Sequence, residues 1–130
     1  MNTAATRPFD RDTALRIARA FLPKHPLGNR WDYYYTLAKL RSDPLYPGVL
    51  QALRGSDAPV LDLGCGLGLL AHALRADDQH MAYRGVDNDA AKITRANKVA
   101  EKNALVDTRF DVVDLAGGPP AHQGSVAILD

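Results

Sequence analysis

The sequence predicts an α/β fold, in which helices cover a parallel β-sheet. From residue 59 onward, short apolar runs alternate with segments of helical periodicity, which is typical of βαβ units. A glycine-rich turn separates the first apolar run from the first of these helices. The preceding part of the chain has a helical pattern and several aromatic residues. We therefore expect an N-terminal helical cap over residues 1–56, flexible over its first residues to about 10, and an α/β domain over residues 57–130.

The glycine-rich turn organises the predicted domain. Residues 60–63 form an apolar run that is too short for a helix and reads as a buried parallel strand. Glycines follow at alternate positions, and residues 69–74 read as a helix. Such a turn aims backbone N–H groups and the positive end of a helix at an anionic or polar ligand. Gly64 allows the tight turn, whereas Gly66 and Gly68 remove side chains where a ligand would approach the backbone.

The remaining elements follow from periodicity, caps and breakers. Before the turn we expect helices from Asp12 or Thr13 to Leu22, over 31–41 and over 47–53. After it we expect strands over 82–87, 109–113 and 125–129. Between the first two of these strands, a helix capped by Asn88 or Asp89 runs to about Asn103. Its expected buried stripe is Ala90, Ile93, Ala96 or Asn97, and Ala100.

The spacing of the glycines distinguishes two nucleotide-binding patterns. The dinucleotide fingerprint is G-x-G-x-x-G. Counted from Gly64, its third glycine would fall at position 69, which is occupied by Leu69. The stretch from Asp62 to Gly68 instead reads D-x-G-x-G-x-G. It resembles motif I of the class I S-adenosylmethionine-dependent methyltransferases, and the resemblance covers residues from about 59 to 130.

This resemblance implies a Rossmann-like, doubly wound parallel sheet with strand order 3-2-1-4 and S-adenosylmethionine as cofactor. In the family the sheet continues beyond its fourth strand, so we expect the chain to be truncated before strand 5. The fourth strand, 126–129, is apolar throughout, which suits a strand paired on both sides. We therefore expect either further residues in the native protein or self-association through this exposed edge.

Two acidic residues lie at strand ends in the pattern expected of a cofactor site. Asp62 can accept N–H groups of its own turn, and the resemblance implies that it also orients the amino-acid end of the cofactor. Asp87 ends the second strand, where a carboxylate can accept hydrogen bonds from ribose hydroxyls. Its alternative role is a helix N-cap, for which Asn88 and Asp89 are also available. The predicted cofactor-binding set in this region is Asp62, Gly64, Cys65, Gly66, Gly68, Asp87 and Asn88.

The ends of the last two strands supply further candidates through the resemblance. Asp114 would accept from the adenine amino group, and Leu115 would flank the ring. The alternative for Asp114 is a surface loop. Asp107 and Asp111 compete for its role, but period-two alternation points Asp111 out of the sheet. Asp130 falls where the family often has a polar residue facing the transferred methyl group.

The second predicted helix begins with an aromatic cluster, which comprises Trp31, Tyr33, Tyr34 and Tyr35. Consecutive helical residues are about 100° apart, so the three tyrosines cannot share one face. We expect two of these residues to pack beneath the cap and one or two, such as Tyr34, to reach the cofactor cleft. Arg30 or Lys39 could meet the cofactor carboxylate, with a solvated cation as the alternative for each.

Composition narrows the classes of partner and compartment. Lysines and arginines number 16 against 15 acidic residues, giving a net charge of +1 without a basic face, so nucleic acid is not the expected partner. The single cysteine, Cys65, permits no intrachain disulfide and fits a reducing cytosol. No apolar run is long enough to span a membrane, and the N-terminus lacks a signal-peptide core, so we expect a cytoplasmic protein. The histidines show no metal-ligand spacing, and no metal is expected.

The leading hypothesis is a methyltransferase that acts on a small-molecule or lipid-like acceptor. The sequence assigns no catalytic base. A second hypothesis is a protein of the same fold that binds the cofactor without turnover. A third is an NAD-dependent enzyme, against which Leu69 argues.

Overall fold

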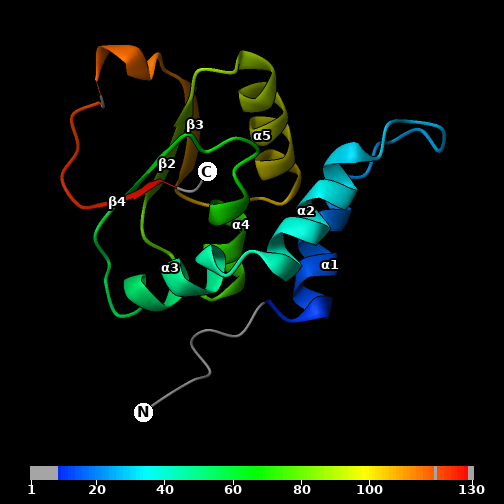
Figure 1. The fold of residues 1–130 in the computed structure, drawn as a ribbon, viewed down its shortest axis with the longest axis horizontal. Helices are drawn as coiled ribbons and strands as arrows, with labels where there is room; N and C mark the ends of the chain where they lie inside the picture. Colours follow the sequence, from blue (N-terminus) through cyan, green and yellow to red (C-terminus); the bar gives the residue numbers. More distant parts are fainter. Residues whose placement is uncertain (1–8, 119, 129–130) are drawn as a thin grey trace. The chain divides into compact units, whose positions relative to one another are not determined.

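A computed structural model describes residues 9–118 and 120–128 of the chain (Figure 1). The chain divides into two compact units, Met1–Leu53 and Arg54–Asp130. None of the helices in the described part of the chain is both long and apolar enough to cross a membrane.

The first unit contains the helices α1 (Arg11–Arg19), α2 (Trp31–Ser42) and α3 (Leu45–Leu53). The cap of α1 is Asp10, whose side chain accepts from the N–H of Thr13, and not Asp12 or Thr13 as predicted. This helix ends before Leu22 because its last N–H groups bond three residues back in a tightened turn. As predicted, α2 ends before Pro44, since a residue that precedes proline disfavours helical geometry.

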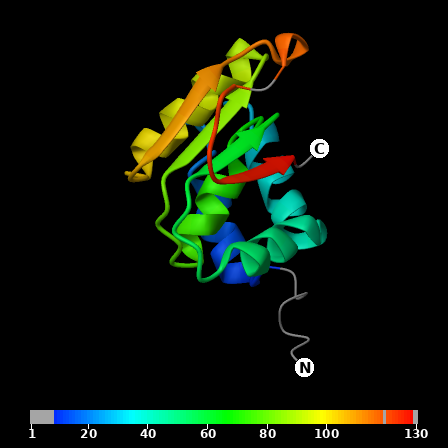
Figure 2. The ribbon, with the colours of Figure 1, turned by 90° about the vertical axis from the view of Figure 1, so that its left-hand side faces the viewer.

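The second unit is built on four parallel strands, β1 (Val60–Leu63), β2 (Tyr83–Asp87), β3 (Thr108–Val112) and β4 (Ser125–Ile128). Their order is β3-β2-β1-β4, and Figure 2 shows them side by side. The predicted α/β fold and strand order are therefore confirmed. Val126 in β4 is 56% exposed, whereas the sequence predicts a strand that is buried on both faces. Leu129 of the predicted strand lies outside the described residues.

Two helices make the crossovers between the first three strands, α4 (Leu69–Ala76) and α5 (Ala90–Lys102). Of the two predicted caps for α5, Asp89 is the residue whose side chain accepts from the N–H of Lys92. The buried residues of α5 are Ile93, Ala96, Val99 and Ala100. Ala90 and Asn97 of the predicted stripe are exposed, because the face of α5 that packs on the sheet includes Val99 and not these two residues. Between β3 and β4 the described residues include a short 3-10 helix, η2 (Leu115–Gly117).

The apolar interior of the second unit lies between the sheet and its helices. Its fully buried side chains include Val60, Leu61, Leu70, Leu74 and Val86. Asp62 is buried among them at 2% exposure. A buried carboxylate is costly unless it is hydrogen-bonded, so the stability of this region depends on the partners of Asp62.

Candidate functional site

The glycine turn after β1 is tied to the end of β2 by main-chain hydrogen bonds. The N–H groups of Gly64 and Cys65 both donate to the carbonyl oxygen of Val86, at 2.8 and 3.0 Å. Gly64, Gly66 and Gly68 have φ values of 70°, 55° and 79°. Side chains rarely tolerate these values, so the left-handed turn explains why glycine stands at all three positions.

Gly66 and Gly68 differ in what surrounds them. A Cβ atom on Gly66 would meet no heavy atom within 4 Å, so the turn borders open space at this point. A Cβ atom on Gly68 would lie 2.4 Å from the ring of Phe110. Gly68 is therefore required for packing against β3, a role that the sequence did not suggest. Gly66 is where a ligand could approach the backbone.

Asp87 stands at the carboxyl end of β2 beside this open space. Its Oδ2 accepts from the N–H of Gly66, and its Oδ1 accepts from the N–H of Asp89, both at 2.9 Å. The side chain of Asp89 caps α5, so the capping role expected as the alternative for Asp87 belongs to its neighbour. A carboxylate oxygen has two lone pairs, and Asp87 therefore keeps acceptor capacity for a ligand. Asn88, the next residue, is exposed.

Asp62 lies in β1 just before the turn. The hydroxyl of Tyr83 donates to its Oδ2 at 2.5 Å, whereas Oδ1 has no partner among the described residues. Burial raises the pKa of Asp62 to about 7; the Tyr83 hydrogen bond lowers it, and the charge of Asp87 raises it. An unsatisfied buried acceptor costs about 1–3 kcal/mol.

The side chain of Cys65 packs over Gly85 of β2. Its Sγ would lie 2.8 Å from a Cβ atom on Gly85 of β2. Burial, followed by the charges of Asp62 and Asp87, raises the pKa of the thiol well above its ordinary value. Cys65 is therefore protonated at neutral pH and is not suited to act as a nucleophile.

Comparison with known proteins identifies the family. A family model described as "Methyltransferase domain" matches residues 54–122, which is more than half of the chain. The chain belongs to this family. The predicted class I methyltransferase resemblance is thereby confirmed. No curated protein matches the chain.

Solved structures show the same fold. The domain is similar to an S-adenosylmethionine-dependent methyltransferase from Thiobacillus denitrificans in complex with S-adenosyl-L-homocysteine, at 26% identity and a TM-score of 0.55, over 68% of this chain and 36% of that one. It is also similar to YjhP from E. coli, at 21% identity and a TM-score of 0.56, over 89% and 43% of the two chains. An RNA methyltransferase from Salinibacter ruber matches at 21% identity and a TM-score of 0.56, over 66% and 57%. The chain thus covers less than two thirds of the length of each of these proteins.

The candidates after β3 of the methyltransferase domain have local partners. Oδ1 of the exposed Asp114 accepts from the N–H of Ala116 at 2.9 Å, which caps η2, and the half-buried Leu115 begins that helix. Oδ2 of Asp111 forms ion pairs with Nε of Arg84 at 2.8 Å and with Nε of Arg109 at 2.9 Å. Asp111 is therefore engaged by ion pairs, which supports the preference for Asp114. Asp130 lies outside the described residues.

The candidates of the first unit lie on α2. Tyr34 is 59% exposed and contacts the ring of Tyr33 edge to face, with centroids 4.9 Å apart. Nζ of Lys39 lies 3.1 Å from Oδ2 of Asp43 in an ion pair along the helix. Of the aromatic cluster, only Tyr33 is half-buried, and its other three members are exposed at 69% for Trp31, 59% for Tyr34 and 41% for Tyr35. The expected burial of two of them is thus not found within the first unit.

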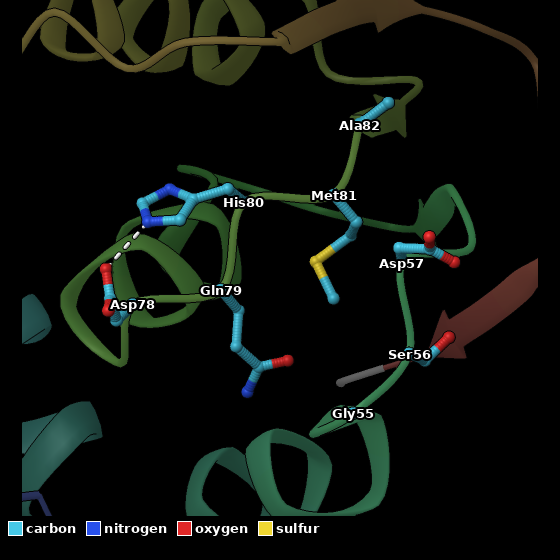
Figure 3. A pocket seen from close by; sticks show the side chains of 8 residues that line it. All are labelled: Gly55, Ser56, Asp57, Asp78, Gln79, His80, Met81 and Ala82. Carbon is cyan, nitrogen blue, oxygen red and sulfur yellow. Dashed lines mark hydrogen bonds and ion pairs between the residues drawn. The ribbon is translucent and has the colours of Figure 1, made fainter.

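The second unit has a pocket of about 440 Å³, and Figure 3 shows the side chains that line it. Its walls come from the segments that precede β1 and β2, at the amino ends of the strands. They are Gly55, Ser56, Asp57, Asp78, Gln79, His80, Met81 and Ala82. Nε2 of His80 lies 2.7 Å from Oδ1 of Asp78, and both side chains are exposed. Ligands of parallel sheets bind at the carboxyl ends, so this pocket is not the predicted cofactor site.

Tyr83 is a residue of the site that the sequence does not identify. The sequence pattern around Tyr83 indicates only a strand. Among the described residues, however, its hydroxyl is the donor that binds the Asp62 carboxylate. The available signal is its position four residues before Asp87, which places both side chains on β2. The strand register needed to connect Tyr83 with Asp62 comes from the structure.

Proposed function

We propose that the domain binds S-adenosylmethionine at the glycine turn and transfers its methyl group to a small-molecule or lipid-like acceptor. The observation that carries this proposal is the open space beside Gly66, bordered by the carboxylate of Asp87. The similar protein from Thiobacillus denitrificans is in complex with S-adenosyl-L-homocysteine, the product form of this cofactor. Its identity to the chain exceeds that of the other two structures described above.

The residues around the turn would divide the recognition of the cofactor. Asp87 would accept hydrogen bonds from the ribose hydroxyls, which are worth about 1.5–3 kcal/mol when the acceptor is charged. The unpartnered Oδ1 of Asp62 would meet the amino-acid end. Asp114 and Leu115 would meet the adenine end, a role supported by their place directly after β3. Tyr34, Lys39, Asn88 and Asp130 remain further proposed contacts.

Methyl transfer mainly requires that the protein position the methyl group and the acceptor atom. When bound, S-adenosylmethionine supplies an electrophilic methyl group on a sulfonium sulfur. The domain would hold that group in line with the acceptor atom, and alignment alone supplies several kcal/mol of rate acceleration. We assign no catalytic base. The even balance of 16 basic and 15 acidic residues favours a small or lipid-like acceptor over nucleic acid.

Calorimetry on the purified chain tests this proposal. We expect binding of S-adenosylmethionine and S-adenosylhomocysteine, and no binding of NAD, because Leu69 replaces the third glycine of the dinucleotide fingerprint. Binding of NAD alone would contradict the proposal. Conversion of S-adenosylmethionine to S-adenosylhomocysteine in the presence of a panel of small acceptors then separates a transferase from a protein that only binds the cofactor.

A further inference from the structure

We propose that Tyr83 is a positioning residue for cofactor binding, because its hydroxyl holds one oxygen of the Asp62 carboxylate and leaves the other for the amino group of the cofactor. The inference rests on the proposed function of the glycine turn. Its geometric basis is the hydrogen bond from Tyr83 to Oδ2 of Asp62, together with an Oδ1 that has no partner in residues 9–118 and 120–128. Asp62 is 2% exposed and its Oδ1 is buried, so the amino group would reach this oxygen only when cofactor binding opens the turn around it.

The ring of Tyr83 is fixed by its neighbours. Tyr83 is 3% exposed and packs edge to face on Phe110, with centroids 5.6 Å apart. Gly85 stands in register between Asp62 on β1 and Phe110 on β3. Because Gly85 has no side chain, Cys65 and Phe110 fill the space above it. A phenylalanine at position 83 would keep these contacts and remove only the hydroxyl.

The charge on Asp62 determines whether it can serve the cofactor. An ammonium group is a donor only, so it is stabilised by the ionised carboxylate and not by the carboxylic acid. The pKa of Asp62 is raised to about 7 by burial, lowered by Tyr83 and raised by Asp87. Cys65, the remaining titratable group of the turn, is held neutral by its own raised pKa.

The helices packed on the sheet add few charges near this pair. On α4, Arg75 interacts by charge with Tyr83, and burial lowers the pKa of His72 to about 4, which keeps it neutral above that pH. On α5, Asn97 donates to the main-chain oxygen of Phe110 at 3.4 Å. The charged side chains of α5 are exposed. Apart from its burial, the groups that influence the titration of Asp62 are therefore Tyr83 and Asp87.

Two consequences follow for binding. The affinity for S-adenosylmethionine should be constant above pH about 7 and fall by about tenfold for each pH unit below it, because binding then requires the loss of a proton from Asp62. In Tyr83→Phe the hydrogen bond that lowers the pKa of Asp62 is lost, so the midpoint of this profile should move to higher pH. Affinity at pH 7 should fall at least about threefold.

The experiment is a double-mutant cycle of wild type, Tyr83→Phe, Asp62→Asn and the double variant. Calorimetric affinity for S-adenosylmethionine is measured from pH 5.5 to 8.5, and the carboxyl carbon of Asp62 is titrated by NMR in the unliganded protein. We expect Tyr83→Phe to shift both profiles to higher pH. In the Asp62→Asn background the profile should be flat in this range, and Tyr83→Phe should have no further effect.

The outcomes separate the inference from the proposed function. A wild type that binds no S-adenosylmethionine at any pH overturns both. Binding that persists with the same pH midpoint in Tyr83→Phe overturns the role of Tyr83 alone. An equal loss of affinity from Tyr83→Phe in the wild-type and Asp62→Asn backgrounds would show a structural effect that does not act through Asp62, and would also overturn it. If Tyr83→Phe does not fold, the wild type alone tests the inference. It is overturned if NMR shows that Asp62 titrates at its ordinary pKa and the affinity for S-adenosylmethionine is constant from pH 5.5 to 8.5.

Discussion

The carboxylate of Asp87 accepts a hydrogen bond of 2.9 Å from the main-chain N–H of Gly66. β1 and β2 are parallel neighbours, so the turn after the first strand meets the last residue of the second at one edge of the sheet. The bond orders the turn in the absence of any ligand. It also brings the negative charge of Asp87 to the point where the turn borders open space.

Asp87→Ala should weaken the binding of S-adenosylmethionine at least about tenfold, since the variant loses charge-assisted bonds worth about 1.5–3 kcal/mol. The fold should remain because Asp89, and not Asp87, caps α5. Calorimetry on protein shown to be folded by circular dichroism makes the measurement. The matched control is Asp111→Asn, which loses ion pairs to Arg84 and Arg109 on the strands and should leave affinity unchanged. Equal affinity of Asp87→Ala and wild type would restrict Asp87 to ordering the turn.

Gly66→Ala should affect binding more than stability. The added methyl group meets no heavy atom within 4 Å, and the cost to folding comes from the positive φ of 55°, at about 1–2 kcal/mol. The same methyl group would occupy the space proposed for the cofactor. We expect affinity for S-adenosylmethionine to fall beyond about tenfold, a loss of about 1.4 kcal/mol or more. Unchanged affinity would show that the ligand does not approach this part of the turn.

Gly68→Ala, in contrast to Gly66→Ala, should affect stability more than binding. Its Cβ atom would lie 2.4 Å from the Phe110 ring, and its φ is 79°. Overpacking and backbone strain together should destabilise the protein by about 2–5 kcal/mol, measured by urea denaturation. In a Phe110→Leu background the collision is relieved, so the cost of Gly68→Ala should be smaller there. A cost that is the same in both backgrounds would attribute the whole effect to φ.

The sequence was sufficient for the strands but not for the partners that they bring together. Val60–Leu63 is short, apolar and followed by alternating glycines, which defines a buried strand from local information alone. The roles of Gly68 and Tyr83 depend on Phe110 and Asp62, and these contacts exist only once three strands adopt a particular register. Sequence spacing carries no such register information.

The orientation of α2 was also beyond the sequence. Its buried residues are Thr36 and Leu40, which share one helical face at a spacing of four. Trp31, Tyr34 and Tyr35 consequently lie exposed on the other side. From the sequence, two residues of the aromatic cluster were expected on the buried face of α2. Leu40 and the packing of α1 against α2 determine the face instead.

Asp62 should make the protein less stable as pH rises. Its pKa is about 7 in the folded protein, against an ordinary 3.8, so the folded state binds the proton more tightly than the unfolded state. The corresponding stability is complete below pH 3.8 and is lost as pH rises to about 7, by up to roughly 4 kcal/mol. Asp62→Asn removes this dependence. Urea denaturation from pH 4 to 8 measures it, and an unaltered profile in the variant would assign the dependence to other groups.

His72 should have the opposite effect over an overlapping range. It is 3% exposed, and burial lowers its pKa from 6.5 to about 4, so the folded state favours the neutral ring. The associated stability is complete above pH 6.5 and is lost as pH falls to about 4, by up to roughly 3 kcal/mol. In wild type the two dependences partly cancel, which predicts a shallow profile from these groups between pH 4 and 6.5. Asp62→Asn should therefore leave a protein that gains stability as pH rises, and His72→Gln one that loses it. Profiles with the same slope in both variants would contradict the assignment of the two buried groups.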